Sequence, residues 1–198
     1  MPDLPASPFA AFDPRPAVRP QPARGATLHD AVPQDAAPLG ALQAQVRGGD
    51  AGRWEGKIAA LIQEPRGTVV VARAEGSLLG FANAEYLPAH PDDGAPAGYY
   101  LTGVTVAPQW RRRGLGRLLT RRRMEWAWWH APDARGEVWC FVSSANPASL
   151  ALHHALGFVA VRSGPAFQGI PFTSGDGTLL RARPKPAEND DSRLAQPG

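Results

Sequence analysis

The stretch that decides the fold is VTVAPQWRRRGLGR, residues 104–117. Its opening residues continue an alternating, β-branched pattern that starts at Tyr99, which predicts a strand over 99–106. Ala107-Pro108 ends that strand, and Gly114 and Gly116 open a segment over 114–130 whose leucines and tryptophans recur at helical spacing. The order of strand, short loop, glycines and helix predicts a helix that begins beside the end of a strand.

The start of this helix is a candidate phosphate site. The first backbone N–H groups of a helix have no partner within the helix, and the helix dipole adds partial positive charge there. Gly114 and Gly116 let a ligand approach the main chain closely. Seven arginines lie between 111 and 123 with no acidic residue among them, although cations at a helix start cost up to about 1 kcal/mol. A bound polyphosphate would make the electrostatic interaction of these arginines with the helix start favourable. The simpler alternative is a tight glycine turn whose arginines are solvated.

The flanking segments predict a single mixed α/β domain of the α+β kind over residues 26–183. Strands are expected over 27–31, 68–74, 77–87, 99–106, 137–142, after 158, and over 178–183. Helices are expected over 35–46, 53–62, 114–130 and 147–156. Residues 1–25 contain seven prolines and predict a flexible arm, and residues 184–198 predict a flexible tail.

Composition excludes several classes of protein. Of the 198 residues, 43% are hydrophobic, which supports a folded core, and the single cysteine, Cys140, excludes a disulfide framework. No apolar run approaches the roughly 18 residues of a membrane span, and the acidic, proline-rich start differs from a secretory signal. The five histidines show no metal-ligand spacing. We therefore expect a soluble, cytoplasmic protein with no metal and no membrane partner.

Two motifs, in order, resemble those of the GCN5-related N-acetyltransferases. RRRGLG, residues 111–116, is similar to the family pattern Q/R-x-x-G-x-G/A, and it follows a strand as it does in that family. NPASLALHHALGF, residues 146–158, is similar to the second element N-x-x-A-x-x-L-Y-x-x-x-G-F. The resemblance covers roughly 27–183. It implies a central, mostly antiparallel sheet flanked by helices, with a parallel, splayed strand pair at the cofactor site.

The resemblance also implies acetyl-coenzyme A (acetyl-CoA) as cosubstrate. Its pyrophosphate is expected on the helix-start residues Arg111, Arg112, Arg113, Gly114, Leu115, Gly116 and Arg117. The pantetheine arm is expected to pair with the main chain of Val104 and Val106, an assignment that depends on position only. Asn146 falls where the family commonly has an asparagine near that arm, and a plain helix cap is its alternative role.

The implied reaction is direct transfer of an acetyl group to a primary amine in a ternary complex. The Val106 N–H is a candidate donor to the oxyanion that forms. Where the family usually has a tyrosine beside the departing sulfur, this chain has His153. A neutral imidazole can hydrogen-bond that sulfur, or donate its proton fully if its pKa is raised; packing on the helix is the alternative. Glu85 is the candidate base, with an ordinary exposed strand carboxylate as the alternative.

The acceptor is expected to be a small-molecule amine, because residues 167–180 resemble the C-terminal part of some bacterial members related to aminoglycoside acetyltransferases. In the loop before the cofactor strand, Asp92 and Asp93 are candidates to attract a cationic amine. The alternative is that these carboxylates are simply solvated in an exposed loop. A non-catalytic acyl-CoA sensor and an arginine-rich nucleic-acid-binding module remain as rivals, although the helix-start context favours a discrete phosphate ligand over nucleic acid. Dimers are common in that family, so a homodimer stays open.

Overall fold

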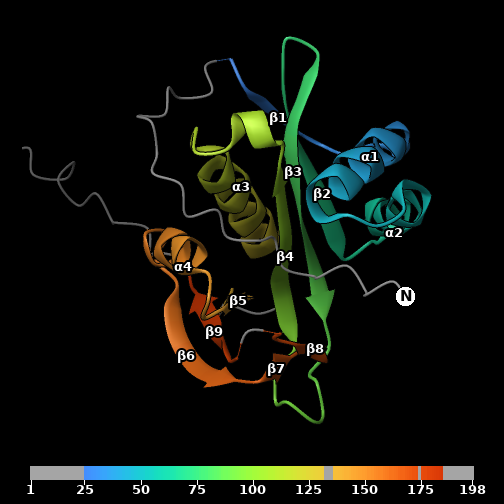
Figure 1. Ribbon diagram of the computed structural model, residues 1–198. Helices are drawn as coiled ribbons and strands as arrows, with labels where there is room; N and C mark the ends of the chain where they lie inside the picture. Colours follow the sequence, from blue (N-terminus) through green and yellow to red (C-terminus); the bar gives the residue numbers. More distant parts are fainter. Residues whose placement is uncertain (1–24, 132–135, 174, 185–198) are drawn as a thin grey trace, which may run out of the picture.

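The computed structural model describes residues 25–131, 136–173 and 175–184. A seven-stranded sheet runs through the domain in the order β1-β2-β3-β4-β5-β9-β6, with a separate two-stranded hairpin, β7-β8 (Figure 1). The strands of the large sheet are β1 (Thr27–Asp30), β2 (Gly67–Ala74), β3 (Ser77–Leu87), β4 (Gly98–Val106), β5 (Val138–Ser143), β6 (Val159–Gly164) and β9 (Gly177–Ala182). The hairpin strands are β7 (Ala166–Phe167) and β8 (Ile170–Pro171).

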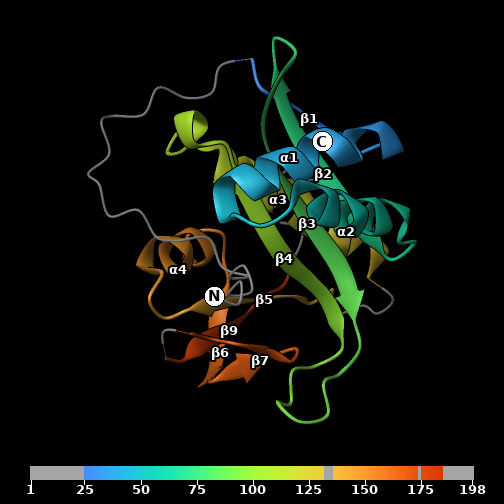
Figure 2. The same ribbon diagram turned by 45° about the vertical axis from the view of Figure 1, so that its right-hand side comes forward.

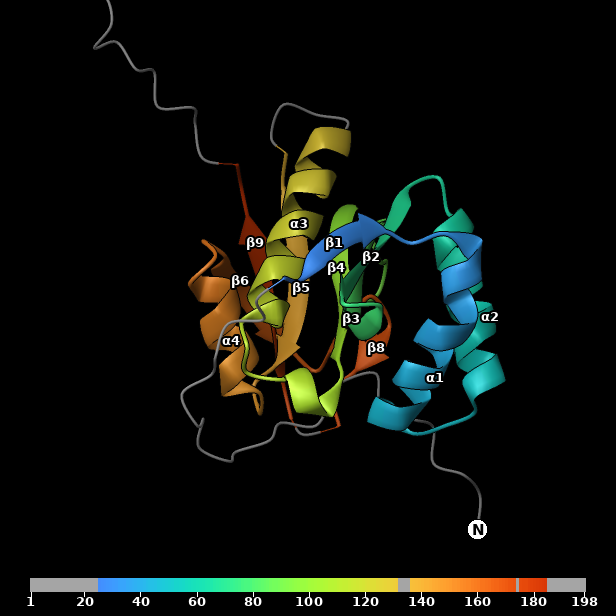
Figure 3. The same cartoon turned by 90° about the horizontal axis from the view of Figure 1, so that it is seen from above.

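Four α-helices accompany the sheet: α1 (Ala36–Arg47), α2 (Ala51–Gln63), α3 (Leu115–His130) and α4 (Pro147–His154). The view from above places α1 and α2 on one face of the sheet and α3 and α4 on the other (Figure 3). None of the described helices is long and apolar enough to cross a bilayer. Except for Gly25 and Pro184, the predicted arm and tail lie outside the described residues.

Apolar side chains fix both layers. Leu39 and Ile58, from α1 and α2, pack against Phe81 of β3 on one face of the sheet. Leu115 and Leu119, from the start of α3, pack against strands β2 and β3 on the opposite face. Strands buried on both faces read as near-continuous apolar runs, which is the pattern of TVVVARA in β2. The two helical layers leave the middle of the sheet accessible only where its strands separate.

That separation occurs between β4 and β5, the one parallel pair in the described sheet. The two strands pair only at Tyr99 with Val138 and Tyr100 with Trp139, after which β5 continues against β9. The predicted splayed parallel pair in a mostly antiparallel sheet is thereby confirmed. A bulge adds to the divergence, because the β3–β4 register shifts between Asn83 and Ala84 and leaves Thr102 as the extra residue of β4.

The sequence-based boundaries agree with the structure or differ from it by one or two residues. The last predicted helix ends at His154 rather than at 156, because Ala155 to Gly157 form a turn that leads into β6. The β7-β8 hairpin was not predicted, since two-residue strands give no periodic pattern. This hairpin lies beside the loop that joins β3 to β4 (Figure 2).

Candidate active site

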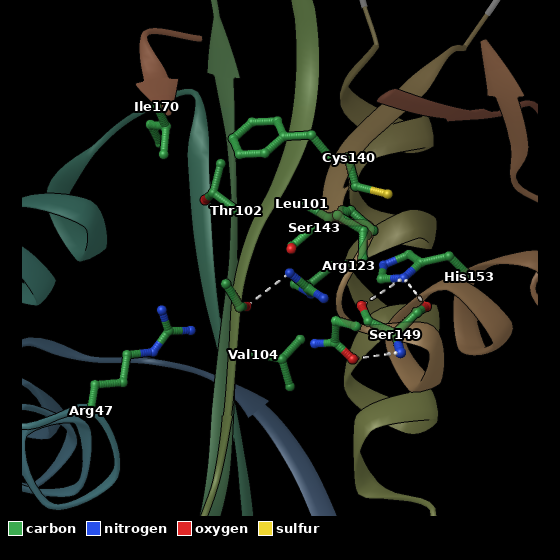
Figure 4. A pocket seen from close by; sticks show the side chains of 14 residues that line it. Arg47, Leu101, Thr102, Val104, Arg123, Cys140, Ser143, Ser149, His153 and Ile170 are labelled. Atoms are coloured by element: carbon green, nitrogen blue, oxygen red, sulfur yellow. Dashed lines mark hydrogen bonds between the residues drawn. The ribbon is translucent and has the colours of Figure 1, made fainter. Parts of the chain in front are cut away.

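A cavity of about 150 Å³ occupies the opening between β4 and β5. It is lined from both faces of the sheet, with Arg47 and Ile170 on one side and His153 and Ser149 on the other (Figure 4). Asn146, the N-cap of α4, also lines it. The strand residues that line it are Leu101, Thr102, Gly103 and Val104 of β4 and Cys140, Phe141, Val142 and Ser143 of β5. The cavity therefore connects the α1–α2 face with the α3–α4 face through the sheet.

The main chain of β4 is turned toward this opening at two of the predicted positions. The N–H of Ala107 donates to Leu79 O (2.9 Å), so the alternation of an antiparallel ladder places Val104 and Val106 at positions that are not hydrogen-bonded to β3. The Val106 carbonyl instead accepts from Arg111 Nε (3.3 Å). Val104 lines the cavity and Val106 does not. Both residues present backbone polar groups away from β3, as pairing with an extended ligand requires.

The start of α3 has the geometry of an anion site. Gly114 is its N-cap, with φ of 80° and no side chain that caps the helix, and Arg112 also has a positive φ of 60°. A Cβ at Gly114 would meet no atom within 4 Å, so the space beside the first N–H groups of α3 is open. At Gly116 the nearest atom to such a Cβ is Leu152 Cδ2 of α4, 3.7 Å away. The loop fits a diphosphate bound by main-chain N–H groups.

The seven arginines of the 111–123 segment point to different surroundings. The guanidinium of Arg113 lies 4.8 Å from the centre of the Trp110 ring, beside the loop. Arg122 pairs with Asp30 of β1 (3.3 Å). Arg123 is 1% exposed and its side chain lines the cavity. Helical periodicity separates these side chains, so only those at the start of α3 surround the proposed phosphate site.

Arg123 is the functional candidate that sequence reasoning missed. Its Nη1 donates to the carbonyl oxygens of Asn83 (2.7 Å) in β3 and Gly103 (3.0 Å) in β4, which form the strand pair next to the bulge. Its Nη2 donates to Thr120 Oγ1 (3.2 Å), and its Nε to Leu119 O (3.4 Å). The one available signal was helical spacing, because Arg123 follows the buried Leu119 by four residues and so shares its face.

Asn146 is a helix cap that also lies in the cavity wall. Its Oδ1 accepts from the Ser149 N–H (3.0 Å), so it caps α4, and the residue also lines the cavity. The cap uses the oxygen of the amide, and the Nδ2 group is a donor that the cap does not use.

His153 lies in the cavity wall, but its chemistry is that of a neutral imidazole. Nδ1 lies 2.8 Å from the Ser149 carbonyl, which can only accept, so the ring proton is on Nδ1 and Nε2 is left as an acceptor. Burial lowers the pKa of His153 to about 4, the bond to Ser149 opposes this, and the nearby charge of Arg123 lowers it further. The raised pKa that full proton donation requires is therefore absent. The ring also packs edge-on against Phe158.

Glu85 is coupled to the cavity through one hydroxyl group. Thr102 Oγ1, in the cavity wall, donates to Glu85 Oε1 (2.8 Å) and accepts from Asn83 Nδ2 (2.5 Å). Burial raises the pKa of the Glu85 carboxyl, the bond from Thr102 opposes this, and Glu64 adds to the rise. The carboxylate is half-buried on the α1–α2 face, so it is not an ordinary exposed strand residue.

Asp93 holds the loop between β3 and β4 in place. Its carboxylate is therefore already bonded within the protein, whereas the sequence made it a candidate to attract a cationic amine. Asp93 Oδ2 accepts from the Gly169 N–H (2.8 Å) and lies 3.2 Å from His90 Nδ1. The Arg162 guanidinium donates to the Asp93 carbonyl. Asp93 thus joins this loop to the β7-β8 hairpin. Among the described residues, no such bonds are found for Asp92.

The aromatic residues divide as the strand alternation predicts. Tyr99 packs edge-on against Trp126 of α3, whereas Tyr100 lies on the opposite face with Trp139 and donates to Pro96 O (2.7 Å). Burial raises the pKa of Tyr100 to about 12. Trp139 is a core residue, but Trp129 is 87% exposed and belongs to no packed cluster. Within the described part of the chain, no three His, Cys, Asp or Glu residues are grouped as metal ligands.

Comparisons with known proteins identify the family of this chain. Residues 36–158 match the acetyltransferase (GNAT) family. The chain is 32% identical over 100 residues to N-alpha-acetyltransferase RimI of Mycobacterium tuberculosis, covering half of this chain and 57% of that protein. It is 44% identical over 75 residues to mycothiol acetyltransferase of Thermobifida fusca, which is 37% of this chain and 19% of that protein. The match thus spans less than two thirds of either relative.

Solved structures share the fold at low identity. A phosphinothricin acetyltransferase from Sinorhizobium meliloti, crystallised with acetyl-CoA, superposes with a TM-score of 0.61 at 20% identity, covering 83% of this chain and 95% of that one. The ribosomal-protein-S18-alanine N-acetyltransferase of Escherichia coli gives 0.60 at 20% identity, covering 83% and 97%. The family match covers more than half of the chain, including β4, the α3 start and α4. The chain belongs to the GNAT acetyltransferase family.

Proposed function

We propose that the chain is an N-acetyltransferase that takes its acetyl group from acetyl-CoA and transfers it directly to a primary amine of a small molecule. One observation carries the proposal: the cavity between β4 and β5 is lined by residues from both faces of the sheet, and the start of α3 lies on one of these faces. Two substrates can therefore meet within the sheet from opposite sides. This is the arrangement that direct transfer in a ternary complex requires.

On the α3–α4 face, the proposed site binds the cosubstrate by main chain. The N–H groups of residues 111–117 are proposed to hold the pyrophosphate, with the side chains of Arg111, Arg112, Arg113 and Arg117 balancing its charge. The backbone groups of Val104 and Val106 face away from β3 and are proposed to pair with the pantetheine arm, with the Val106 N–H donating to the oxyanion. Asn146 Nδ2 is proposed to add one side-chain donor. When bound, acetyl-CoA supplies the activated acetyl group.

On the α1–α2 face, Glu85 is proposed to accept the proton of the amine. Its raised pKa makes it a stronger base than an exposed glutamate, and the Thr102 hydroxyl connects it with the cavity wall. His153 is not proposed as the acid, because its ring proton is engaged with Ser149 and its pKa is near 4. It stays in the proposal as a neutral residue of the cavity wall.

The acceptor class has one competitor. The match to a protein named N-alpha-acetyltransferase favours an α-amine of a polypeptide as the second candidate. Asp93 joins the 88–97 loop to the β7-β8 hairpin, and Ile170 of this hairpin lines the cavity on the α1–α2 side, so we take a small acceptor as the first candidate. The rival acyl-CoA sensor has the same cosubstrate site and differs only in lacking transfer.

The test is release of free thiol from acetyl-CoA with aminoglycosides, polyamines, amino acids and peptides offered separately. Thiol release with a small amine supports the proposal, and release only with peptides supports the second acceptor class. Binding of acetyl-CoA without release for any amine indicates the sensor. Failure to bind acetyl-CoA by calorimetry, combined with salt-sensitive binding to DNA or RNA, would refute the proposal in favour of the nucleic-acid module.

A further inference from the structure

Arg123 places a permanent positive charge inside the domain. Its side chain is 1% exposed, and no carboxylate of the described residues forms an ion pair with it. A buried cation is costly unless hydrogen bonds compensate it. The bonds to Asn83, Gly103, Thr120 and Leu119 use four of the five guanidinium N–H groups. The acceptors are neutral, so the charge is held in place but is not cancelled.

This charge acts on the groups that line the cavity. Burial lowers the pKa of His153, and the Arg123 charge lowers it further, so the ring stays neutral. Burial raises the pKa of the Cys140 thiol, and Arg123 is the group that opposes the rise. The field of Arg123 thus favours a negatively charged sulfur at the cavity wall and disfavours a second positive charge there. Burial also lowers the pKa of Arg123 itself to about 9, which leaves it charged at neutral pH.

We propose that Arg123 stabilises the thiolate that leaves during acetyl transfer, and that it does so through its charge rather than by donating a proton. The inference rests on the proposed function. In the reaction, the amine nitrogen bonds to the acetyl carbon, the carbon–sulfur bond breaks with its electron pair on sulfur, and the amine proton passes to Glu85. The sulfur leaves as an anion, because His153 has no proton to give on Nε2. A fixed cation in a cavity of low dielectric lowers the energy of that anion.

Other charged groups around the cavity do not take this place. Arg47 lines it from α1, on the α1–α2 face, where the amine is proposed to enter. Glu85 reaches the wall only through Thr102 and is an acid–base group of the opposite sign. Cys140 and His153 are neutral at pH 7, because burial shifts the pKa of each away from its charged form. Arg123 is therefore the cation on the α3–α4 face, where the cosubstrate sulfur is expected.

The test measures the pKa of the coenzyme A thiol when it is bound, by the ultraviolet absorbance of the thiolate. We expect it to be at least about one unit lower on the wild-type chain than for free coenzyme A in solution. Arg123→Met removes the charge and should return the value to near that of free coenzyme A, whereas Arg123→Lys keeps the charge but not the forked bonds and should keep the value low. Arg121→Met, on the exposed face of α3, is the matched control and should behave as wild type.

A purely structural role for Arg123 predicts a different result. Lys and Met would then weaken coenzyme A binding alike, without moving the pKa of the bound thiol. If Arg123→Met fails to fold, the wild type alone decides: coenzyme A should gain about tenfold in affinity relative to S-methyl coenzyme A as the pH rises through the thiol pKa. A constant ratio overturns the inference and leaves the proposed function standing. Failure of both compounds to bind overturns the two together.

Discussion

Acidification should lower the free energy of unfolding of this protein, because the buried imidazole of His153 must then take up a proton. The pKa of His153 is lowered from 6.5 to about 4 by burial, with the Arg123 charge adding to it and the Ser149 bond opposing. Each pKa step between the unfolded and folded values corresponds to about 1.4 kcal/mol, so the full difference is about 3 kcal/mol. Because the folded value is the lower one, this stability is fully present above pH 6.5 and is lost as the pH falls toward 4.

The assay is urea unfolding, followed by tryptophan fluorescence at about pH 7.5 and about pH 4.5, on wild type and on His153→Asn. Asparagine places an amide N–H where His153 Nδ1 stands, so it can keep the bond to the Ser149 carbonyl without titrating. Wild type should lose about 2 to 3 kcal/mol more than the variant between the two conditions. Carboxylates with a raised pKa, Glu85 among them, are common to both chains, and their contribution cancels in the difference.

The matched control is His154→Asn. This neighbouring ring is exposed, and its charge is only the smallest of the causes that lower the pKa of His153, so its removal should leave most of the dependence of stability on pH in place. If wild type and His153→Asn lose the same free energy on acidification, His153 is not held neutral by burial. Its exclusion as the proton donor would then lose its physical basis.

Three further predictions concern the base, the helix start and the loop. Glu85→Gln should lower kcat by about 100-fold or more. It should also remove the fall in rate at acidic pH, which in wild type begins above pH 4.5 because burial raises the pKa of Glu85. Measuring thiol release as a function of pH tests both effects. Gly114 has a φ of 80°, so Gly114→Ala should lower the free energy of unfolding by about 1 kcal/mol and raise the KM for acetyl-CoA several-fold. Gly56 lies inside α2 with open space around an added Cβ, so Gly56→Ala should instead stabilise the protein by about 0.5–1 kcal/mol in thermal unfolding. Asp93→Ala should destabilise by about 1–2 kcal/mol and speed hydrogen exchange at the Gly169 amide, and unchanged exchange would contradict the proposed tie between the loop and the hairpin.

The local elements and the family followed from sequence because their signals are local. The alternation in YYLTGVTV, the Ala-Pro stop and the glycines at 114 and 116 each act over a few residues, and the structure places β4 and the start of α3 accordingly. The Asn146 cap could be predicted for the same reason, since its partner is three residues away. The splayed parallel pair came from the resemblance of two motifs, because pairing between distant strands leaves no local pattern.

The tertiary structure alone decided which side chains carry charge into the cavity. Arg122 and Arg123 are adjacent in the sequence, yet one pairs with Asp30 at the surface and the other is buried beside the bulge. Glu85 and Thr102 lie on different strands and meet only because β3 and β4 pair. Burial and long-range neighbours set the pKa of His153 in the direction opposite to the one that proton donation needs. Charge and burial depend on what the whole fold packs around a group, and that information is not present in the spacing of residues along the chain.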